Sequence, residues 1–169
     1  GSIVSRFKPK GNCRGGGFSK DGARLFVSGD GDTSEPLYVL NATNYSQLAP
    51  IPVPGLRKTE VYTTREYGYV IHGFSIPLIN VVSLAANALV KTLTVGRPVL
   101  SLSISVDGSR IYVCSQTGGE VEVIDTSTHA LMKSIASSPA ARRASVTPDN
   151  KRLYICEPTL NSIKVVYVE

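Results

Sequence analysis

The sequence predicts an all-β fold built from four copies of one repeat. The segment Val123–Leu131 aligns with Val81–Leu89, an offset of 123 − 81 = 42 residues. The same step reaches Val39–Thr43 in one direction and Val165–Val168 in the other, so four copies share one phase. No segment shows the apolar spacing of an amphipathic helix. A regular period of this length indicates a repeat architecture.

Each copy contains a turn that leads into its second strand, which is apolar. The turns start at Ser19, Thr64, Ser105 and Thr147, which are spaced by 45, 41 and 42 residues. Three of these turns contain Asp-Gly or Asp-Asn, which tolerate the positive backbone angles of tight hairpins. The β-branched and aromatic runs that follow are typical of strands: Arg24–Val27, Tyr69–Ile71, Arg110–Cys114 and Arg152–Cys156.

A third strand rich in Val and Ile and a fourth segment, such as Val90–Val95, complete the copy. Four short antiparallel strands in ~40–45 residues form one blade of a β-propeller. We therefore expect a single β-propeller domain over residues 1–169, with four blades at approximately 8–53, 54–95, 96–136 and 137–169. The last copy stops after its third strand, so residues 1–7, which contain the strand-like Ile3–Phe7, are predicted to complete that blade. Such a clasp would remove an exposed sheet edge.

Four blades leave three arrangements open. The chain forms a small closed ring, shares a larger ring with a second copy as a homodimer, or is part of a longer propeller. In the homodimer, residues 1–7 would complete the last blade of the partner.

The third and fourth copies resemble a known family of repeats. Asp107–Ser115 followed by Val121–Thr126, and again Pro148–Cys156, resemble the YVTN-type β-propeller repeat. The first copy matches moderately, and the second departs at Glu66–Gly68. The resemblance covers nearly the whole chain and implies the fold rather than a function, because the shared residues form turns and blade cores. Relatives include surface-layer and extracytoplasmic binding proteins and similar lactonase-like propellers, so the resemblance favours an extracytoplasmic or secreted location. The chain has no Trp and therefore lacks the Trp-Asp signature of WD40 repeats.

Composition and charge narrow the classes of function. The chain is 42% hydrophobic and 18% charged, which is typical of a globular domain. No apolar run approaches the roughly 18 residues of a membrane span. Cys13, Cys114 and Cys156 are too few and too widely spaced for a disulfide framework or a CxxC-type zinc site. Cys114 and Cys156 occupy the same position in neighbouring copies and are expected to be free and buried. The net charge of +5 permits anionic partners without requiring nucleic acid.

The motifs of enzyme active sites are absent from the sequence. There is no Gly-x-Ser-x-Gly elbow and no phosphate-binding loop, and Gly15–Gly17 is interpreted as a flexible turn. His72 and His129 lie in different repeat phases, which argues against a His-based metal site, and His72 is expected to have a hydrogen-bonded structural role. The acidic loop Asp30–Glu35 lacks the later glycine and glutamate of a calcium loop and is expected to be a hairpin turn. We expect no catalytic residue, no metal and no cofactor.

Basic residues recur where the chain passes from one blade to the next. Such connections surround the mouth of a propeller channel, where ligands usually bind. Eight of the 18 basic residues lie there: Lys8, Lys10, Arg14, Arg57, Lys58, Arg97, Arg142 and Arg143. A ring of cations favours carboxylate, phosphate or sulfated glycan ligands. We predict a site for an anionic ligand at this basic mouth, formed by Lys10, Arg14, Arg57, Lys58, Arg97, Arg142 and Arg143. The connections lack interleaved aromatic residues for base stacking, which disfavours nucleic acid as a partner.

One turn is apolar where a polar turn is expected. Phe74, Ile76 and Leu78 interrupt the connection between the second and third strands of the second copy. They are predicted either to contact a partner protein or to pack against a neighbouring blade.

Taken together, these features predict a non-catalytic binding or scaffolding propeller whose partner is a protein or an anionic ligand. The enzyme alternative is a lactonase-like hydrolase that polarises a carbonyl with a channel-facing Arg or His. It would require acids or histidines clustered at the mouth, and few are available. The third alternative is a ring-forming assembly module or an excised part of a larger propeller.

Overall fold

The computed structural model confirms the all-β prediction. It describes residues 1–29, 36–54, 58–72, 76–115, 117–139 and 141–168, with the backbone alone for residues 58 and 59. These residues form fourteen strands and one short 3-10 turn, Pro158–Leu160, and no α-helix. All strand pairs within the sheets are antiparallel.

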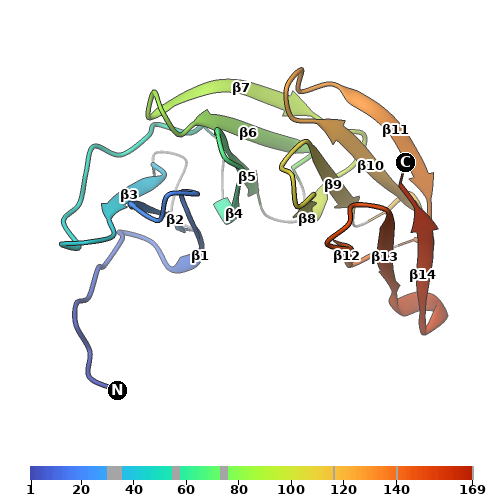
Figure 1. Cartoon of the computed structure of the whole chain (residues 1–169), viewed down its shortest axis with the longest axis horizontal. Helices are drawn as coiled ribbons and strands as arrows, with labels where there is room; N and C mark the ends of the chain where they lie inside the picture. Colours follow the sequence, from blue (N-terminus) through green and yellow to red (C-terminus); the bar gives the residue numbers. More distant parts are fainter. Residues whose placement is uncertain (30–35, 55–57, 73–75, 116, 140, 169) are drawn as a thin grey trace. The chain divides into compact units, whose positions relative to one another are not determined.

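The strands form four separate sheets in chain order, which we call blades 1 to 4 (Figure 1). Blade 1 contains β1 (Cys13–Phe18), β2 (Arg24–Gly29) and β3 (Tyr38–Asn41). Blade 2 contains β4 (Lys58–Thr63), β5 (Tyr67–His72), β6 (Leu78–Ser83) and β7 (Ala88–Thr94). Blade 3 contains β8 (Val99–Ile104), β9 (Arg110–Ser115), β10 (Glu120–Asp125) and β11 (Leu131–Ala136). Blade 4 contains β12 (Arg143–Val146), β13 (Arg152–Glu157) and β14 (Ser162–Tyr167).

The blades are grouped in two compact units. The first unit spans residues 1–72 and 79–92 and holds blade 1 and most of blade 2. The second spans residues 73–78 and 93–169 and holds blades 3 and 4. The interpretation of the chain as one domain stays a prediction.

The predicted closing strand at the N-terminus is not formed. Ile3–Phe7 lie outside every strand, and blade 4 has three strands. Blade 1 also has three strands rather than four, with isolated bridges from Leu37 to Ile51 and from Leu40 to Gln47 beside β3. The physical reason is a competing contact: the Phe7 ring packs edge-on against Tyr38 of β3, 5.3 Å between centroids. This contact half-buries the Phe7 side chain, whereas an isolated strand without a paired edge is not stabilised.

The backbone repeats with the period that the sequence predicts. Tyr45, Asn87 and His129 have positive φ angles of 61°, 52° and 55°, and they follow one another at steps of 42 residues. Gly108 and Asn150 form a second such pair, again 42 residues apart, with φ angles of 77° and 57°. Left-handed backbone at the same position of several copies shows that the copies share a turn geometry and not only similar side chains.

Hydrogen bonds explain why the predicted turns recur. The Ser105 hydroxyl donates to the Asp107 carboxylate (2.6 Å), and the Ser109 backbone N–H donates to the same oxygen (3.0 Å). The pairs Ser19 with Asp21 and Thr147 with Asp149 repeat this arrangement. These donors hold the pKa of all three carboxyl groups below the usual value. In the second copy Thr64 keeps its hydroxyl role, but Glu66 replaces the aspartate, which accounts for the weak match there.

A pH-dependence prediction follows from a second turn, at Asp125. Its carboxylate accepts bonds from the hydroxyl of Ser127 and the backbone N–H of Thr128, and these bonds lower its pKa to about 2. A carboxyl whose pKa is lower in the folded chain stabilises the fold above pH ~4, and this contribution is lost as the pH falls toward 2. Asn41 accepts the equivalent backbone bonds in blade 1 without a charge. We therefore expect Asp125→Asn to keep the turn and to lose less thermal stability than the wild type between pH 5 and pH 2.5. Melting temperatures by circular dichroism check this, and an equal loss in both proteins would contradict it.

The core of the first unit lies between blades 1 and 2. Phe26, Leu37 and Val39 of the first blade and its loop meet Val61, Val70 and Val82 of the second, and all are buried. Strand β1 packs directly against β4. The interpretation of Gly15–Gly17 as a flexible turn is wrong, because these residues form part of β1. A Cβ on Gly17 would lie 3.1 Å from the carbonyl oxygen of Val61, so the glycines allow this close approach.

The core of the second unit lies between blades 3 and 4. Tyr112, Val121 and Val123 of blade 3 pack against Leu153 and Ile155 of blade 4, and all five side chains are fully buried. The strands β8 and β12 are in contact at the same interface. Each unit therefore has its own apolar core made by two neighbouring blades.

Candidate functional site

The basic mouth residues of the first unit lie at the starts of the first strands of its blades. Lys10 precedes β1 and Arg14 lies in it, and both are exposed. The backbone N–H of Lys10 donates to the Tyr38 hydroxyl (3.3 Å). Lys58 is the first residue of β4. Arg57 lies outside the described residues.

The second unit places its basic mouth residues in the same way. Arg97 precedes β8, Arg142 precedes β12 and Arg143 begins it, and all three are exposed. Two hydrogen bonds fix the backbone of Arg142: its N–H donates to the Cys156 carbonyl (3.1 Å), and its carbonyl accepts from the Ser101 hydroxyl (2.8 Å). These bonds hold the backbone at Arg142 in place, and the Arg142 and Arg143 side chains are exposed.

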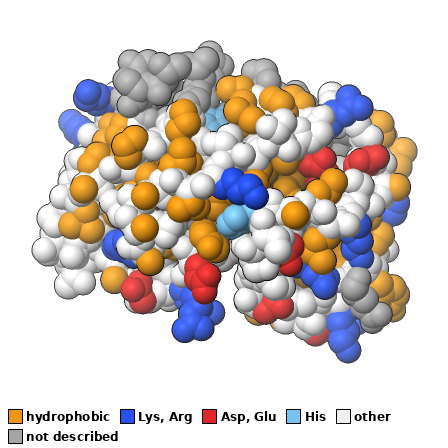
Figure 2. Space-filling view, turned by 90° about the horizontal axis from the view of Figure 1, so that it is seen from above, with side chains coloured by type: hydrophobic (Ala, Val, Ile, Leu, Met, Phe, Trp, Pro, Cys, Tyr) orange, Lys and Arg blue, Asp and Glu red, His pale blue; other side chains and the backbone are white. Residues whose placement is uncertain are grey.

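Acidic side chains share the surroundings of Arg97. A small pocket of about 60 Å³ is lined by Arg97, Ser115, Thr117, Gly118, Glu120 and Glu122. Glu122 accepts a hydrogen bond from the backbone N–H of Gly96 (3.0 Å). Glu120 and Glu122 therefore offset part of the positive charge of Arg97. Figure 2 likewise shows Lys and Arg side chains separated by apolar and polar groups on the face that it presents.

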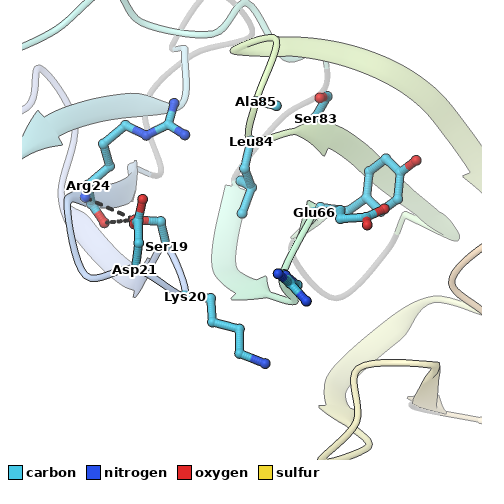
Figure 3. A pocket seen from close by; sticks show the side chains of 10 residues that line it. Ser19, Lys20, Asp21, Arg24, Glu66, Ser83, Leu84 and Ala85 are labelled. Atoms are coloured by element: carbon cyan, nitrogen blue, oxygen red, sulfur yellow. Dashed lines mark hydrogen bonds between the residues drawn. The ribbon is translucent and has the colours of Figure 1, made fainter.

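A hollow of about 800 Å³ lies at the turns of blades 1 and 2 rather than at the strand starts (Figure 3). Figure 3 shows Ser19, Asp21 and Arg24 on one side and Glu66 on the other, with Leu84 between them. The full lining is Ser19, Lys20, Asp21, Arg24, Arg65, Glu66, Tyr67, Ser83, Leu84 and Ala85. The sequence predicts Lys20 and Arg24 only as solvated hairpin charges.

The chemistry of this hollow is mixed. Asp21 already accepts bonds from the Ser19 hydroxyl (2.5 Å) and the Ala23 backbone N–H (3.0 Å), which lower its pKa. It is therefore an ionised turn residue rather than a general acid. The Arg24 guanidinium lies over the Phe26 ring, 5.7 Å from its centroid. Cations and carboxylates line the hollow together, so its walls do not select one sign of charge.

His72 has the structural role that the sequence predicts. It is buried, and its Nε2 lies 3.0 Å from the Asn80 side-chain nitrogen. That nitrogen also donates to the Pro54 carbonyl (2.7 Å), and the Asn80 oxygen accepts from the Thr92 hydroxyl (2.8 Å). Because a carbonyl only accepts, these contacts fix the Asn80 amide and make His72 Nε2 an acceptor. His129 is half-buried in the turn between β10 and β11.

The other predicted sites are only partly described. Ile76 and Leu78 of the apolar loop are half-buried, and Phe74 lies outside the described residues. The loop Asp30–Glu35 also lies outside them. Within the described ranges, no group of three or more His, Cys, Asp or Glu side chains could hold a metal ion. The three cysteines are free; Cys114 is buried as expected, whereas Cys13 and Cys156 are exposed. No helix in the described part of the chain is long and apolar enough to cross a membrane.

Comparisons with known proteins identify the architecture. No protein-family model matches the sequence, and no curated protein matches it either. Among solved structures, hydrazine synthase of Kuenenia stuttgartiensis is 20% identical with a TM-score of 0.77, covering 98% of this chain and 52% of that one. The Cps50 (Swd1) β-propeller domain of Myceliophteria thermophila is 13% identical with a TM-score of 0.74, covering 93% of this chain and 54% of that one.

A third solved structure is also similar to this chain. The dihydro-heme d1 dehydrogenase NirN, in complex with DHE, is 16% identical with a TM-score of 0.69, covering 86% of this chain and 33% of that one. The chain therefore spans about half the length or less of these proteins. Their names describe their own activities, and at this level of identity the likeness concerns the fold alone. The chain has a β-propeller fold.

Proposed function

We propose that this chain is a non-catalytic binding or scaffolding propeller of the YVTN-like type, which takes an anionic ligand at its basic mouth residues. The observation that supports this most is recurrence: in both units the described first strands of the blades begin beside basic residues. In blade 4 two exposed arginines, Arg142 and Arg143, follow one another at such a start. Arginine forms paired hydrogen bonds with carboxylate, phosphate and sulfate groups, so these ligand classes fit best.

The binding class is favoured over the lactonase-like hydrolase by the state of the candidate groups. His72, the buried histidine, is held by Asn80 within the first unit. The aspartates with lowered pKa are occupied by turn hydrogen bonds. Neither kind of group is poised to move a proton to or from a substrate.

Blade 4 offers a matched pair of variants to test the anionic site. Arg142→Ala/Arg143→Ala removes two basic residues at the start of β12. Lys151→Ala/Arg152→Ala removes two exposed basic residues, one in the turn before β13 and one at the first position of β13. Both variants lose two charges. We expect the first to bind heparin, as a sulfated glycan probe, roughly tenfold or more weakly, because two charge-assisted contacts are lost. The second should bind nearly as the wild type does.

Retention on a heparin column at low salt, together with titration calorimetry, measures this difference. If both variants weaken binding equally, the attraction depends on net charge alone and the proposed site is wrong.

A further inference from the structure

Blade 4 carries an apolar sheet face that is exposed. Tyr154, Ile163, Val165 and Tyr167 are 39%, 67%, 49% and 75% exposed, and Cys156 between them is exposed as well. Along β13 these residues alternate with the fully buried Leu153 and Ile155. One side of the sheet therefore makes the core with blade 3, and the other, which we call the outer face of blade 4, meets solvent.

The same positions in blade 3 form a buried interface. Subtracting 42 from each number leads from Tyr154, Cys156, Ile163 and Val165 to Tyr112, Cys114, Val121 and Val123. The strand register is also the same, since Val165 pairs with Tyr154 as Val123 pairs with Tyr112. In blade 3 these four side chains are fully buried, in one cluster with blade 4 residues. The outer face of blade 4 is therefore chemically a blade-to-blade contact surface.

The complementary surface is present on blade 1 of the same chain. Blade 4 contacts blade 3 through Leu153 and Ile155. When the strands are aligned, the equivalent residues of blade 1 are Leu25 and Val27. Leu25 pairs with Leu40 as Leu153 pairs with Val166. We call this surface, Leu25, Val27, Tyr38 and Leu40, the outer face of blade 1. Val27, Tyr38 and Leu40 are buried in the chain, with exposed fractions of 6%, 6% and 7%, and Leu25 is half-buried. Phe7 of the N-terminal segment, which forms no strand, packs against them.

We propose that the outer face of blade 4 binds the outer face of blade 1 of a second copy of this chain. This contact would repeat, between two copies of the chain, the kind of interface that joins blades 3 and 4 within one copy. Two such contacts related by a two-fold axis use both outer faces of each copy, and the eight blades together fall at the upper end of the ~4–8 range of propellers.

The N-terminal segment would act as the cap of the free chain. Phe7 shields Tyr38, and the segment carries the exposed Ile3 and Val4. An incoming blade has to displace this small cap, and the larger apolar contact favours the displacement. This assembly does not depend on the anionic ligand, so the two proposals can fail separately.

Two valines of equal exposure give a matched test of the contact. Val165 lies on the outer face of blade 4 and Val90 lies on β7 of blade 2, and each is 49% exposed. We expect the wild type to be a dimer by light scattering over a concentration series. Val165→Asp should raise the dimer dissociation constant at least tenfold, because it would bury an unpaired charge. Val90→Asp should leave the dissociation constant unchanged.

Thiol labelling gives an independent measurement at the same face. In a Cys13→Ser background, Cys156 is the one exposed cysteine, since Cys114 is buried. Its reaction with a maleimide should slow as the concentration rises and dimers form, and Val165→Asp should restore the fast rate. A wild type that stays monomeric throughout, or a dimer that Val165→Asp leaves intact, would overturn the proposal, whether the face is then covered by another partner or by none.

Discussion

Replacing Ile155 by alanine is expected to lower the free energy of unfolding by about 2–5 kcal/mol. Ile155 is fully buried in the cluster between blades 3 and 4, where it lies with Tyr112 and Val123. Truncation removes apolar surface from the core and leaves a cavity that the surrounding strands fill only in part. Urea unfolding followed by circular dichroism measures the change as a lower midpoint.

Met132→Ala is the control for this substitution. Met132 has a side chain of similar size and also lies in a strand of the second unit, β11, but it is 48% exposed. We expect it to change stability by less than about 1 kcal/mol. Equal losses in the two variants would mean that the cluster between blades 3 and 4 does not hold the second unit together.

The repeat could be predicted from the sequence because its signals are local. The turn at Asp107 needs a hydroxyl two residues before the aspartate and, after the aspartate, a residue that adopts positive φ. Both residue types can be identified in the sequence. The strands follow these turns at fixed spacing. The second strands of the first, third and fourth copies therefore begin where predicted, at Arg24, Arg110 and Arg152.

The predictions that failed depend on contacts between segments that lie far apart in the sequence. Ile3–Phe7 has the composition of a strand, but a strand requires a paired edge, and Phe7 packs on Tyr38 instead. No local pattern distinguishes these two outcomes. Three glycines without the strand-to-helix context of a phosphate-binding loop predict a flexible turn at Gly15–Gly17. Only the close approach of β1 to its neighbours shows why glycine is needed in a strand there.

The hollow in the first unit could not be predicted from the sequence either. It is lined by side chains from three separate turns, including those at Asp21, Glu66 and Leu84. Repeat alignment places each turn, but it does not give the space between them. A missing hairpin aspartate in the second copy, where Glu66 stands, was the one signal that this region departs from the other copies.

The glycines of β1 lead to the second large effect that we expect. A Cβ on Gly16 would lie 2.8 Å from the carbonyl oxygen of Phe26 in the paired strand, a distance that real Cβ atoms essentially never show. Because the obstacle is backbone, β1 must move away from β2, and Gly17 beside it is already close to the backbone of β4. We expect Gly16→Ala to cost about 1–3 kcal/mol of unfolding free energy.

Gly29→Ala separates this steric effect from the general effect of a glycine substitution. Gly29 lies in β2, and a Cβ there would meet its nearest neighbour, the Asn12 carbonyl oxygen, at an ordinary 3.6 Å. Alanine at such a position restricts the unfolded chain, so a gain of roughly 0.4–1 kcal/mol is expected. Urea unfolding of both variants measures the difference. If Gly16→Ala proved as stable as Gly29→Ala, then β1 would not be held against β2 and β4 by close backbone approach, and the core of the first unit would depend on its apolar side chains alone.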